Sequence, residues 1–301
     1  MPTTTHMATA ADDARHAPGP GALPLWNESF WFPFYDPKAE IGVVVRVGTL
    51  PRQGTANVYL FLTHRGDVVH ALVDHALPHP ALEPSRLALP NGLAIEWTPR
   101  ERFRLRYAHA AHGFDVEWTG TSPTYLYPHP PEASAEEYPR HIEHAGTVRG
   151  TVTIAGRAYA VDALAHRDHS WGGERDWAKM WAWDYLSGEF GPDLWFNAVR
   201  IRLVPDGDWF PIGCLWDGRE LHAIGDLAID SPAADGGTCQ AGVEARFTDE
   251  RGRPFRMVGG APLVTCPVQF GRTWLKDGIV EWRCGARTGF GIHELGYVER
   301  E

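Results

Sequence analysis

The chain has 301 residues, of which 44% are hydrophobic and 22% are charged, a composition typical of a globular protein. Its formal net charge of −10 argues against a nucleic-acid partner, because phosphate binding requires clustered Lys and Arg side chains. No apolar run approaches the roughly 18 residues of a spanning helix, so we expect no integral membrane segment.

The N-terminal segment is rich in small and polar residues and lacks the apolar stretch of a secretory signal. We therefore expect residues 1–24 to form a disordered tail. The four cysteines show no CxxC spacing and are expected to be small, mostly buried thiols, which favours a cytoplasmic location.

Short runs rich in β-branched and aromatic residues dominate the remainder of the chain. In chain order they cover residues 41–49, 56–64, 68–73, 103–110, 114–120, 147–154, 157–166, 179–187, 194–203, 209–216, 220–229, 242–248, 254–260, 264–270, 278–285 and 288–298. Arg65-Gly66-Asp67 and Ala155-Gly156 separate neighbouring runs as hairpin turns would. The best helix signal, over 130–144, is interrupted by Pro139. This regular spacing of strands predicts sandwiches or barrels.

The densest polar and aromatic segment, HRDHSWGGERDW, spans 166–177 and follows directly on a predicted strand. The Asp168 carboxylate can orient an imidazole or pair with Arg167, and either arrangement shifts proton affinities. An alternative interpretation is that Arg167, with Asp168 or Asp176, forms a buried ion-pair network that is purely structural.

Metal and cofactor motifs are not evident in the sequence. Residues three apart on a strand point to opposite faces, so neither His166 with His169 nor His141 with His144 would chelate a metal from a strand. No glycine-rich nucleotide motif occurs, so we expect no cofactor and no metal.

The candidate site residues surround this motif. Of the 13 tryptophans, seven lie between positions 171 and 216, a density typical of a pocket for a bulky apolar ligand, although a large β core would also absorb some of them. The catalytic candidates are Asp168, His169, Asp184, Glu28 and Glu143. The substrate-binding candidates are Trp171, Trp177, Trp181, Trp183, Tyr185, Trp195 and His144.

The motif, together with HIEHAGTVRGTVTIAG (141–156), resembles the hydroxyneurosporene synthase and carotenoid 1,2-hydratase superfamily. Its hydratases carry an HDHNWG-like segment, which His166, Asp168, His169, Trp171 and Gly172 match. Arg167 and Ser170 differ from it, and the RDHSWG variant and the segment NESFWFPFYD (27–36) are similar to a bacterial branch. Tocopherol cyclase and the fungal decalin-forming Diels–Alderases are relatives of the same superfamily.

The resemblance implies two lipocalin-like domains, which agrees with the strand pattern. We therefore predict an all-β fold of two antiparallel β-barrels, with domains over 25–165 and 166–301. The leading hypothesis is a cofactor-independent lyase, hydratase, cyclase or isomerase that acts by acid–base chemistry on an isoprenoid-like or polycyclic substrate. Two alternatives stay open: a lipid carrier without catalysis, and a metal-assisted hydrolase if loops bring histidines together.

Overall fold

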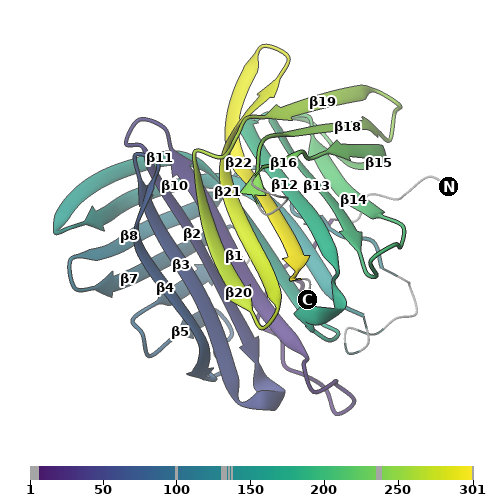
Figure 1. The fold of residues 1–301 in the computed structure, drawn as a ribbon. Coiled ribbons are helices and arrows are strands. Elements are labelled where there is room, and N and C mark those ends of the chain that lie inside the picture. Colours follow the sequence, from purple (N-terminus) through teal and green to yellow (C-terminus); the bar gives the residue numbers. More distant parts are fainter. Residues whose placement is uncertain are drawn as a thin grey trace. The chain divides into compact units, whose positions relative to one another are not determined.

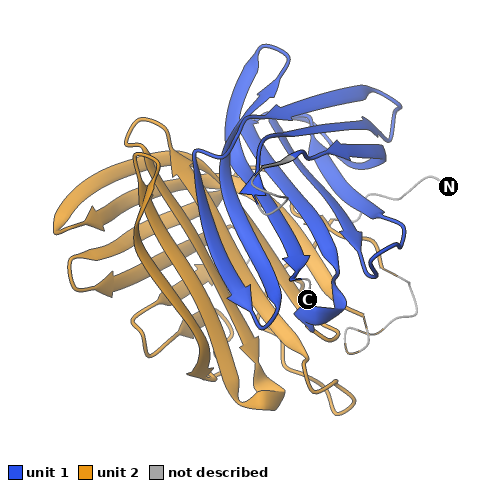
Figure 2. Cartoon of the chain, viewed as in Figure 1, with its two compact units in different colours: residues 1–5, 176–301 blue, residues 6–175 orange. Residues whose placement is uncertain are grey.

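The structure is a computed structural model. It describes residues 7–98, 101–129, 134, 136, 138–234 and 239–299. Contacts divide the chain into two compact units (Figure 2). We call them the N-terminal unit (residues 6–175, orange) and the C-terminal unit (residues 176–301, blue). Strand β11 continues to Gly172, past the predicted boundary at 165/166, so most of the motif belongs to the N-terminal unit.

The N-terminal unit is an antiparallel sheet that curls into an open half-barrel, in the order β4-β3-β2-β1-β11-β10-β8-β7-β6-β5, with β9 beside β10 (Figure 1). A short 3-10 helix, η1 (Pro51–Gln53), connects β2 to β3. The strands are β1 (Asn27–Asp36), β2 (Ile41–Leu50), β3 (Thr55–His64), β4 (Asp67–Pro78), β5 (Arg86–Ala88), β6 (Ala94–Thr98), β7 (Arg102–His109), β8 (His112–Gly120), β9 (Tyr125–Leu126), β10 (Arg140–Ile154) and β11 (Arg157–Gly172).

The C-terminal unit is a closed barrel, because β19 pairs with both β18 and β21 and so joins the two ends of the sheet. The strand β20 pairs with β21 outside this ring, and β16 and β17 form a separate small ladder. The elements are η2 (Trp177–Lys179), β12 (Ala182–Gly191), β13 (Leu194–Arg202), β14 (Phe210–Trp216), β15 (Leu221–Asp230), β16 (Ala233–Ala234), β17 (Cys239–Gln240), β18 (Val243–Asp249), β19 (Pro254–Gly259), β20 (Val264–Phe270), β21 (Thr273–Cys284) and β22 (Arg287–Val298).

The predicted hairpins form where the local sequence permits a left-handed turn. Arg65 and Gly66 have φ of 55° and 86°, and Ala155 and Gly156 have φ of 50° and 79°. Two consecutive positive φ values match the twist of the flanking strands, and glycine adopts the second one without strain. These turns set the register of β3 with β4 and of the long β10–β11 pair.

Strand β1 is absent from the strand runs predicted above, although it lies at the centre of the N-terminal sheet between β2 and β11. Every residue of β1 except Tyr35 is buried, so its two faces do not alternate between apolar and polar. A strand that is buried on both faces gives a continuous apolar run rather than a period of two.

The all-β fold with two lipocalin-like domains is confirmed, one sheet being closed and the other open. The weak helix signal over 130–144 lies partly outside the described residues, and its described end, from Arg140 on, is the start of β10. No helix in the described ranges is long and apolar enough to cross a membrane.

Candidate active site

Strand β11 distributes the central motif over two faces of the N-terminal sheet, because successive side chains of a strand point to opposite sides. On one face, His169 stacks against Phe30 with ring centroids 4.1 Å apart, and the Arg167 guanidinium lies 4.3 Å from the ring of Phe103. Both rings belong to the hydrophobic core, so we call this the core face. Asp168 lies on the opposite side, which we call the polar face.

On the polar face, cross-strand register aligns five side chains in one row. Asp168 lies opposite Glu143 of β10 and opposite Trp31 of β1, Trp31 lies opposite Arg46 of β2, and Arg46 lies opposite Tyr59 of β3. Directly opposed residues of an antiparallel pair have Cβ atoms about 4.5–5.5 Å apart. The register therefore surrounds Asp168 with a carboxylate, an indole and a nearby guanidinium.

Glu143 is the buried anchor of the polar face. Two imidazoles donate to it, His141 Nε2 to Oε1 and His166 Nε2 to Oε2, each at 2.6 Å, and the Tyr127 hydroxyl donates to Oε1 at 3.2 Å. Burial alone would raise the pKa of Glu143, but the charge of His141 and the hydrogen bonds from His141 and His166 outweigh it and lower this pKa. Glu143 is therefore held as a carboxylate.

Asp168 differs from the other members of its row, because it is partly exposed while Glu143, Trp31, Arg46 and Tyr59 are buried. Among the described residues, no hydrogen-bond donor lies within bonding distance of its carboxylate. Desolvation of the carboxyl group and the negative charge of Glu143 together raise the pKa of Asp168 to about 6, against the opposing charges of His141 and Arg46. Asp168 can therefore carry a proton at mildly acidic pH.

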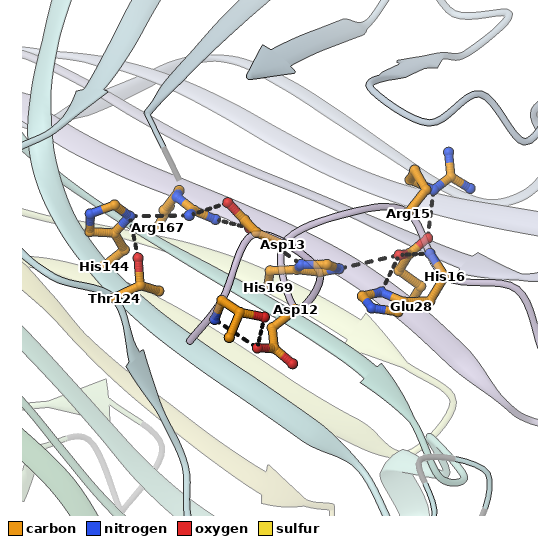
Figure 3. Close-up of polar contacts among 10 residues, drawn as sticks. Asp12, Asp13, Arg15, His16, Glu28, Thr124, His144, Arg167 and His169 are labelled. Atoms are coloured by element: carbon orange, nitrogen blue, oxygen red, sulfur yellow. Dashed lines mark hydrogen bonds and ion pairs between the residues drawn. The ribbon is translucent and has the colours of Figure 1, made fainter. Parts of the chain in front are cut away.

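The core face carries a network of buried ion pairs (Figure 3). Both terminal nitrogens of Arg167 donate to Asp13, at 2.8 and 2.7 Å. His169 lies between two carboxylates, with Nδ1 3.5 Å from Asp13 Oδ1 and Nε2 3.2 Å from Glu28 Oε1. Burial alone would lower the pKa of His169, but its contacts with Asp13 and Glu28 outweigh burial and raise this pKa. We call these residues, with their partners Arg15 and His16, the clasp.

Glu28 joins the clasp to the N-terminal segment. Arg15 Nε donates to Oε2 at 2.6 Å, and the His16 backbone N–H donates to Oε1 at 2.7 Å. The His16 ring stacks on Trp171, with centroids 4.3 Å apart. Ligand atoms of His16, Glu28 and His169 all lie within 4.8 Å of one another, so this is the group of described residues that could hold a metal ion.

His144, a predicted substrate-binding residue, is fully enclosed. Its Nε2 faces the Ser122 carbonyl at 2.8 Å and must donate, so its Nδ1 accepts from Arg167 and from the Thr124 hydroxyl, each at 3.1 Å. Burial and the Arg167 charge hold the pKa of His144 well below its usual range. The ring is therefore neutral, and it stabilises the clasp by accepting the hydrogen bond from Arg167.

The predicted disordered tail is wrong over its described part. Ala8 and Asp13 are buried, and the Ala8 N–H donates to the Thr124 carbonyl at 3.0 Å. Burial of the Asp13–Arg167 ion pair removes both charges from water, which costs free energy. The two parallel hydrogen bonds of the pair and the stacking of His16 on Trp171 offset this cost. A segment without regular secondary structure is thus fixed to the sheet by its charges.

The structure separates some of the predicted catalytic residues and joins others. Asp168 and His169 point to opposite faces and cannot act as a contacting pair. Glu143 lies opposite Asp168 on the polar face, whereas Glu28 contacts His169 in the clasp.

Asp184 belongs to the C-terminal unit. It accepts from Arg200 Nε at 2.7 Å, and its Oδ1 lies 3.2 Å from His293 Nε2. Burial raises the pKa of Asp184, but His293 and Arg200 outweigh it and lower this pKa. Asp184 is therefore the anionic partner of two basic side chains, separate from the Asp168 row.

The predicted aromatic residues are divided between the two units. Trp171 is buried beneath His16 in the N-terminal unit. Trp177 stacks on Trp183, with centroids 5.8 Å apart, in the C-terminal unit. Trp181, Tyr185 and Trp195 also belong to the C-terminal unit. A cavity bordered by Trp171 and at least two of Trp177, Trp181, Trp183 and Trp195 stays a prediction.

Sequence reasoning missed several partners of the candidate residues. His141 could have been found, because it lies two residues before Glu143 and so shares its strand face. Trp31 and Arg46 required the strand register, and Asp13 and His16 required the path of the N-terminal segment.

Comparison with known families shows which family the chain belongs to. It belongs to the family described as "Domain of unknown function (DUF7064)", whose model matches residues 9–298. The match begins within the segment that we had expected to be disordered, in agreement with the clasp. No curated protein matches the sequence significantly.

Solved structures share the fold at low sequence identity. A putative AttH from Nitrosomonas europaea is 14% identical, with a TM-score of 0.68 over 95% of this chain and 100% of that chain. Kievitone hydratase from Nectria haematococca is 11% identical, with a TM-score of 0.63 over 97% and 94%. CghA with Sch210972 is 10% identical, with a TM-score of 0.63 over 92% and 89%. These likenesses show that the chain shares its fold with the three proteins.

Proposed function

We propose that the protein is an enzyme that adds, removes or relocates a proton on a hydrophobic small molecule, in a reaction of the hydratase, lyase or cyclase kind, without an organic cofactor. One observation carries the proposal. Asp168 is a partly exposed carboxyl group without a hydrogen-bond partner among the described residues, in a row whose other members are buried. A carboxyl group that only stabilised the fold would be paired.

Asp168 is suited to be the acid. A general acid works best when its pKa lies near the working pH, and the raised pKa of Asp168 meets this condition. Glu143, directly opposite, is held as the anion and therefore favours the protonated form of Asp168. One carboxylate thus supports the acid function of the other.

His141 is suited to be the base. Its Nε2–H donates to Glu143 at 2.6 Å, which leaves the lone pair on Nδ1 to accept a proton. The same carboxylate–imidazole pairing orients the base of hydrolytic triads. The His141 side chain is 21% exposed, whereas His166, the other imidazole on Glu143, is 1% exposed and has a supporting role.

The reaction can be written with all atoms balanced. In hydration, the Asp168 O–H bond breaks as its proton forms a C–H bond with an alkene carbon, which leaves a cation on the adjacent carbon. Water attacks that carbon and transfers a proton to His141 Nδ1. Dehydration runs the steps in reverse. In cyclisation, an internal alkene attacks the cation instead of water, and the new ring cation loses a proton from the adjacent carbon to His141 Nδ1, which leaves an alkene.

The neighbours of Asp168 favour a substrate that passes through a carbocation. Trp31 of β1 is directly opposite Asp168 of β11. Aromatic faces stabilise a cation by about 0.5–2 kcal/mol each and do not react with it. This setting supports an isoprenoid-like or polycyclic substrate that forms a carbocation, and the name of kievitone hydratase supports a reaction of the hydratase kind.

An isotope experiment tests the proposal. The purified full chain is incubated with a panel of hydrophobic alkenes and tertiary alcohols in deuterated water and in water labelled with heavy oxygen, and the products are analysed by mass spectrometry. We expect deuterium on carbon for a hydration or a proton-initiated cyclisation, heavy oxygen as well for a hydratase, and loss of water from a tertiary alcohol for a dehydratase. Tight binding of panel members with no isotope incorporation and no loss of water would indicate a carrier and overturn the proposal.

A further inference from the structure

We propose that the Nδ1 atom of His16, Glu28 Oε1 and His169 Nε2 form a binding site for a transition-metal ion such as Zn²⁺. The site lies in the clasp, on the core face of the sheet (Figure 3). It brings together one residue of the N-terminal segment, one of β1 and one of β11. Two imidazoles and a carboxylate are a ligand set that zinc sites use.

Two of the three distances between the ligand atoms match those of a tetrahedral ion, and all three atoms lie within 4.8 Å of one another. Zn²⁺ ligands at about 2.0–2.1 Å from the metal lie about 3.3–3.4 Å from one another. Glu28 Oε1 is 3.2 Å from His16 Nδ1 and 3.2 Å from His169 Nε2. Both contacts are longer than the charge-assisted hydrogen bonds of the same carboxylate, which measure 2.6 Å to Arg15 and 2.7 Å to the His16 N–H.

The residues around the ligands have the arrangement that a metal site needs. Metal-binding histidines usually donate their other ring N–H to a carboxylate, and His169 Nδ1 faces Asp13 at 3.5 Å. Arg15 donates a hydrogen bond to Glu28 Oε2, so Glu28 would bind the ion through Oε1 only. Asp13 and Glu28 balance the charges of Arg15 and Arg167, and the ion replaces protons of the two histidines, which pass to solvent.

The exposure of the ligands indicates how the ion enters and what it does. Glu28 and His169 are buried, but the His16 side chain is 21% exposed, which leaves one open side for entry and for a water ligand. Because His16 comes from the N-terminal segment, the ion would fix this segment to the sheet. Asp168 lies on the other face, so the proposed acid–base reaction does not require the ion.

Zinc titration of the full chain tests this site. After dialysis against a chelator, we expect isothermal calorimetry with Zn²⁺ to show one ion per chain, and Co²⁺ to give the intense visible absorption of a tetrahedral complex. His16→Ala and His16→Gln should each weaken binding at least tenfold and reduce that absorption. Circular dichroism verifies that each variant is folded.

The surface histidines provide the matched control. The rings of His70 and His112 stack with centroids 5.0 Å apart, so these two imidazoles lie close together outside the clasp. We expect His112→Ala to leave Zn²⁺ affinity unchanged. The proposal is overturned if wild type binds no stoichiometric Zn²⁺, if the His16 variants bind as tightly as wild type, or if His112→Ala abolishes binding.

Discussion

Carboxylates and histidines gather on both faces of the sheet around β11, in opposite electrostatic settings. On the core face, Asp13 and Glu28 each meet cationic partners at 2.6–2.8 Å. On the polar face, Asp168 has no such partner among the described residues and lies opposite the anionic Glu143. Paired charges fix a structure, whereas an unpaired and crowded carboxyl group retains chemical reactivity. The comparison therefore assigns stability to the clasp and chemistry to the Asp168 row.

Breaking the clasp should give the largest effect on stability. Asp13→Ala leaves the Arg167 guanidinium buried without its two hydrogen bonds to the Asp13 carboxylate. Loss of one partner of a buried pair costs about 3–5 kcal/mol. We expect urea unfolding to show this loss in the free energy of unfolding. A loss below about 1 kcal/mol would show that the clasp does not hold the fold, by comparison with exposed ion pairs.

Glu143→Gln sharpens the comparison on the polar face. The amide removes the charge that favours protonated Asp168 and weakens the orientation of His141. We expect turnover to fall about tenfold or more, within the range of acid–base catalysis. The alkaline limb of the pH–rate profile, which reports loss of the Asp168 proton, should also move to lower pH. Reduced turnover with an unmoved pH profile would mean that Glu143 acts only on the structure.

The two faces should respond to pH with opposite signs. Hydrogen bonds and opposite charges overcome burial and lower the pKa values of Asp13 and Glu28, so their contribution to stability is present above about pH 4 and is lost as pH falls. Asp168 has an ordinary pKa of 3.8, and the fold raises this pKa to about 6. Between these two pH values the folded protein binds the proton more strongly than the unfolded chain, so the contribution of Asp168 to stability decreases as pH rises from 3.8 to about 6.

Asp168→Asn tests the loss of stability that the raised pKa of Asp168 causes as pH rises. Above pH 6 we expect the variant to be more stable than wild type by about 1–2 kcal/mol, reduced from the full linkage value because the side chain is partly exposed. Below pH 4 the two proteins should be equally stable. Thermal unfolding at both pH values measures the difference, and a variant that is less stable at pH 7 would contradict the assignment.

Asp184→Asn should have the smallest effect on activity. Asp184 is the partner of Arg200 and His293 in the C-terminal unit, so its loss should reduce the free energy of unfolding. Turnover per folded molecule should stay within about twofold of wild type, because no general acid or base is removed. A loss of a hundredfold in a folded variant would place Asp184 in the chemistry.

Local signals in the sequence were sufficient for much of the fold. The Ala155-Gly156 turn and the alternating strands predicted the hairpins, because these depend on neighbouring residues. The closure of the C-terminal barrel through β19 and β21 depends on pairing between Gly259 and Trp282, which no local pattern encodes.

The candidate site was only partly predictable for the same reason. Asp168 and Glu143 were identified as single residues, but their opposition across β10 and β11 follows from register. Asp13 and His16 lie in a segment whose composition is typical of disorder, and only their charged partners on β11 and β1 reveal their role. The sequence identified reactive residue types, and the strand register determined which of them meet.

The central claim is that Asp168 is the acid of a chemical reaction and not a structural carboxylate. The most direct measurement compares deuterium incorporation by wild type, Asp168→Asn and the clasp variant His169→Gln, each corrected for the folded fraction. We expect Asp168→Asn to be fully folded and to incorporate deuterium at least a hundredfold more slowly. His169→Gln should lose stability but retain its rate per folded molecule. Undiminished incorporation by folded Asp168→Asn would contradict the account.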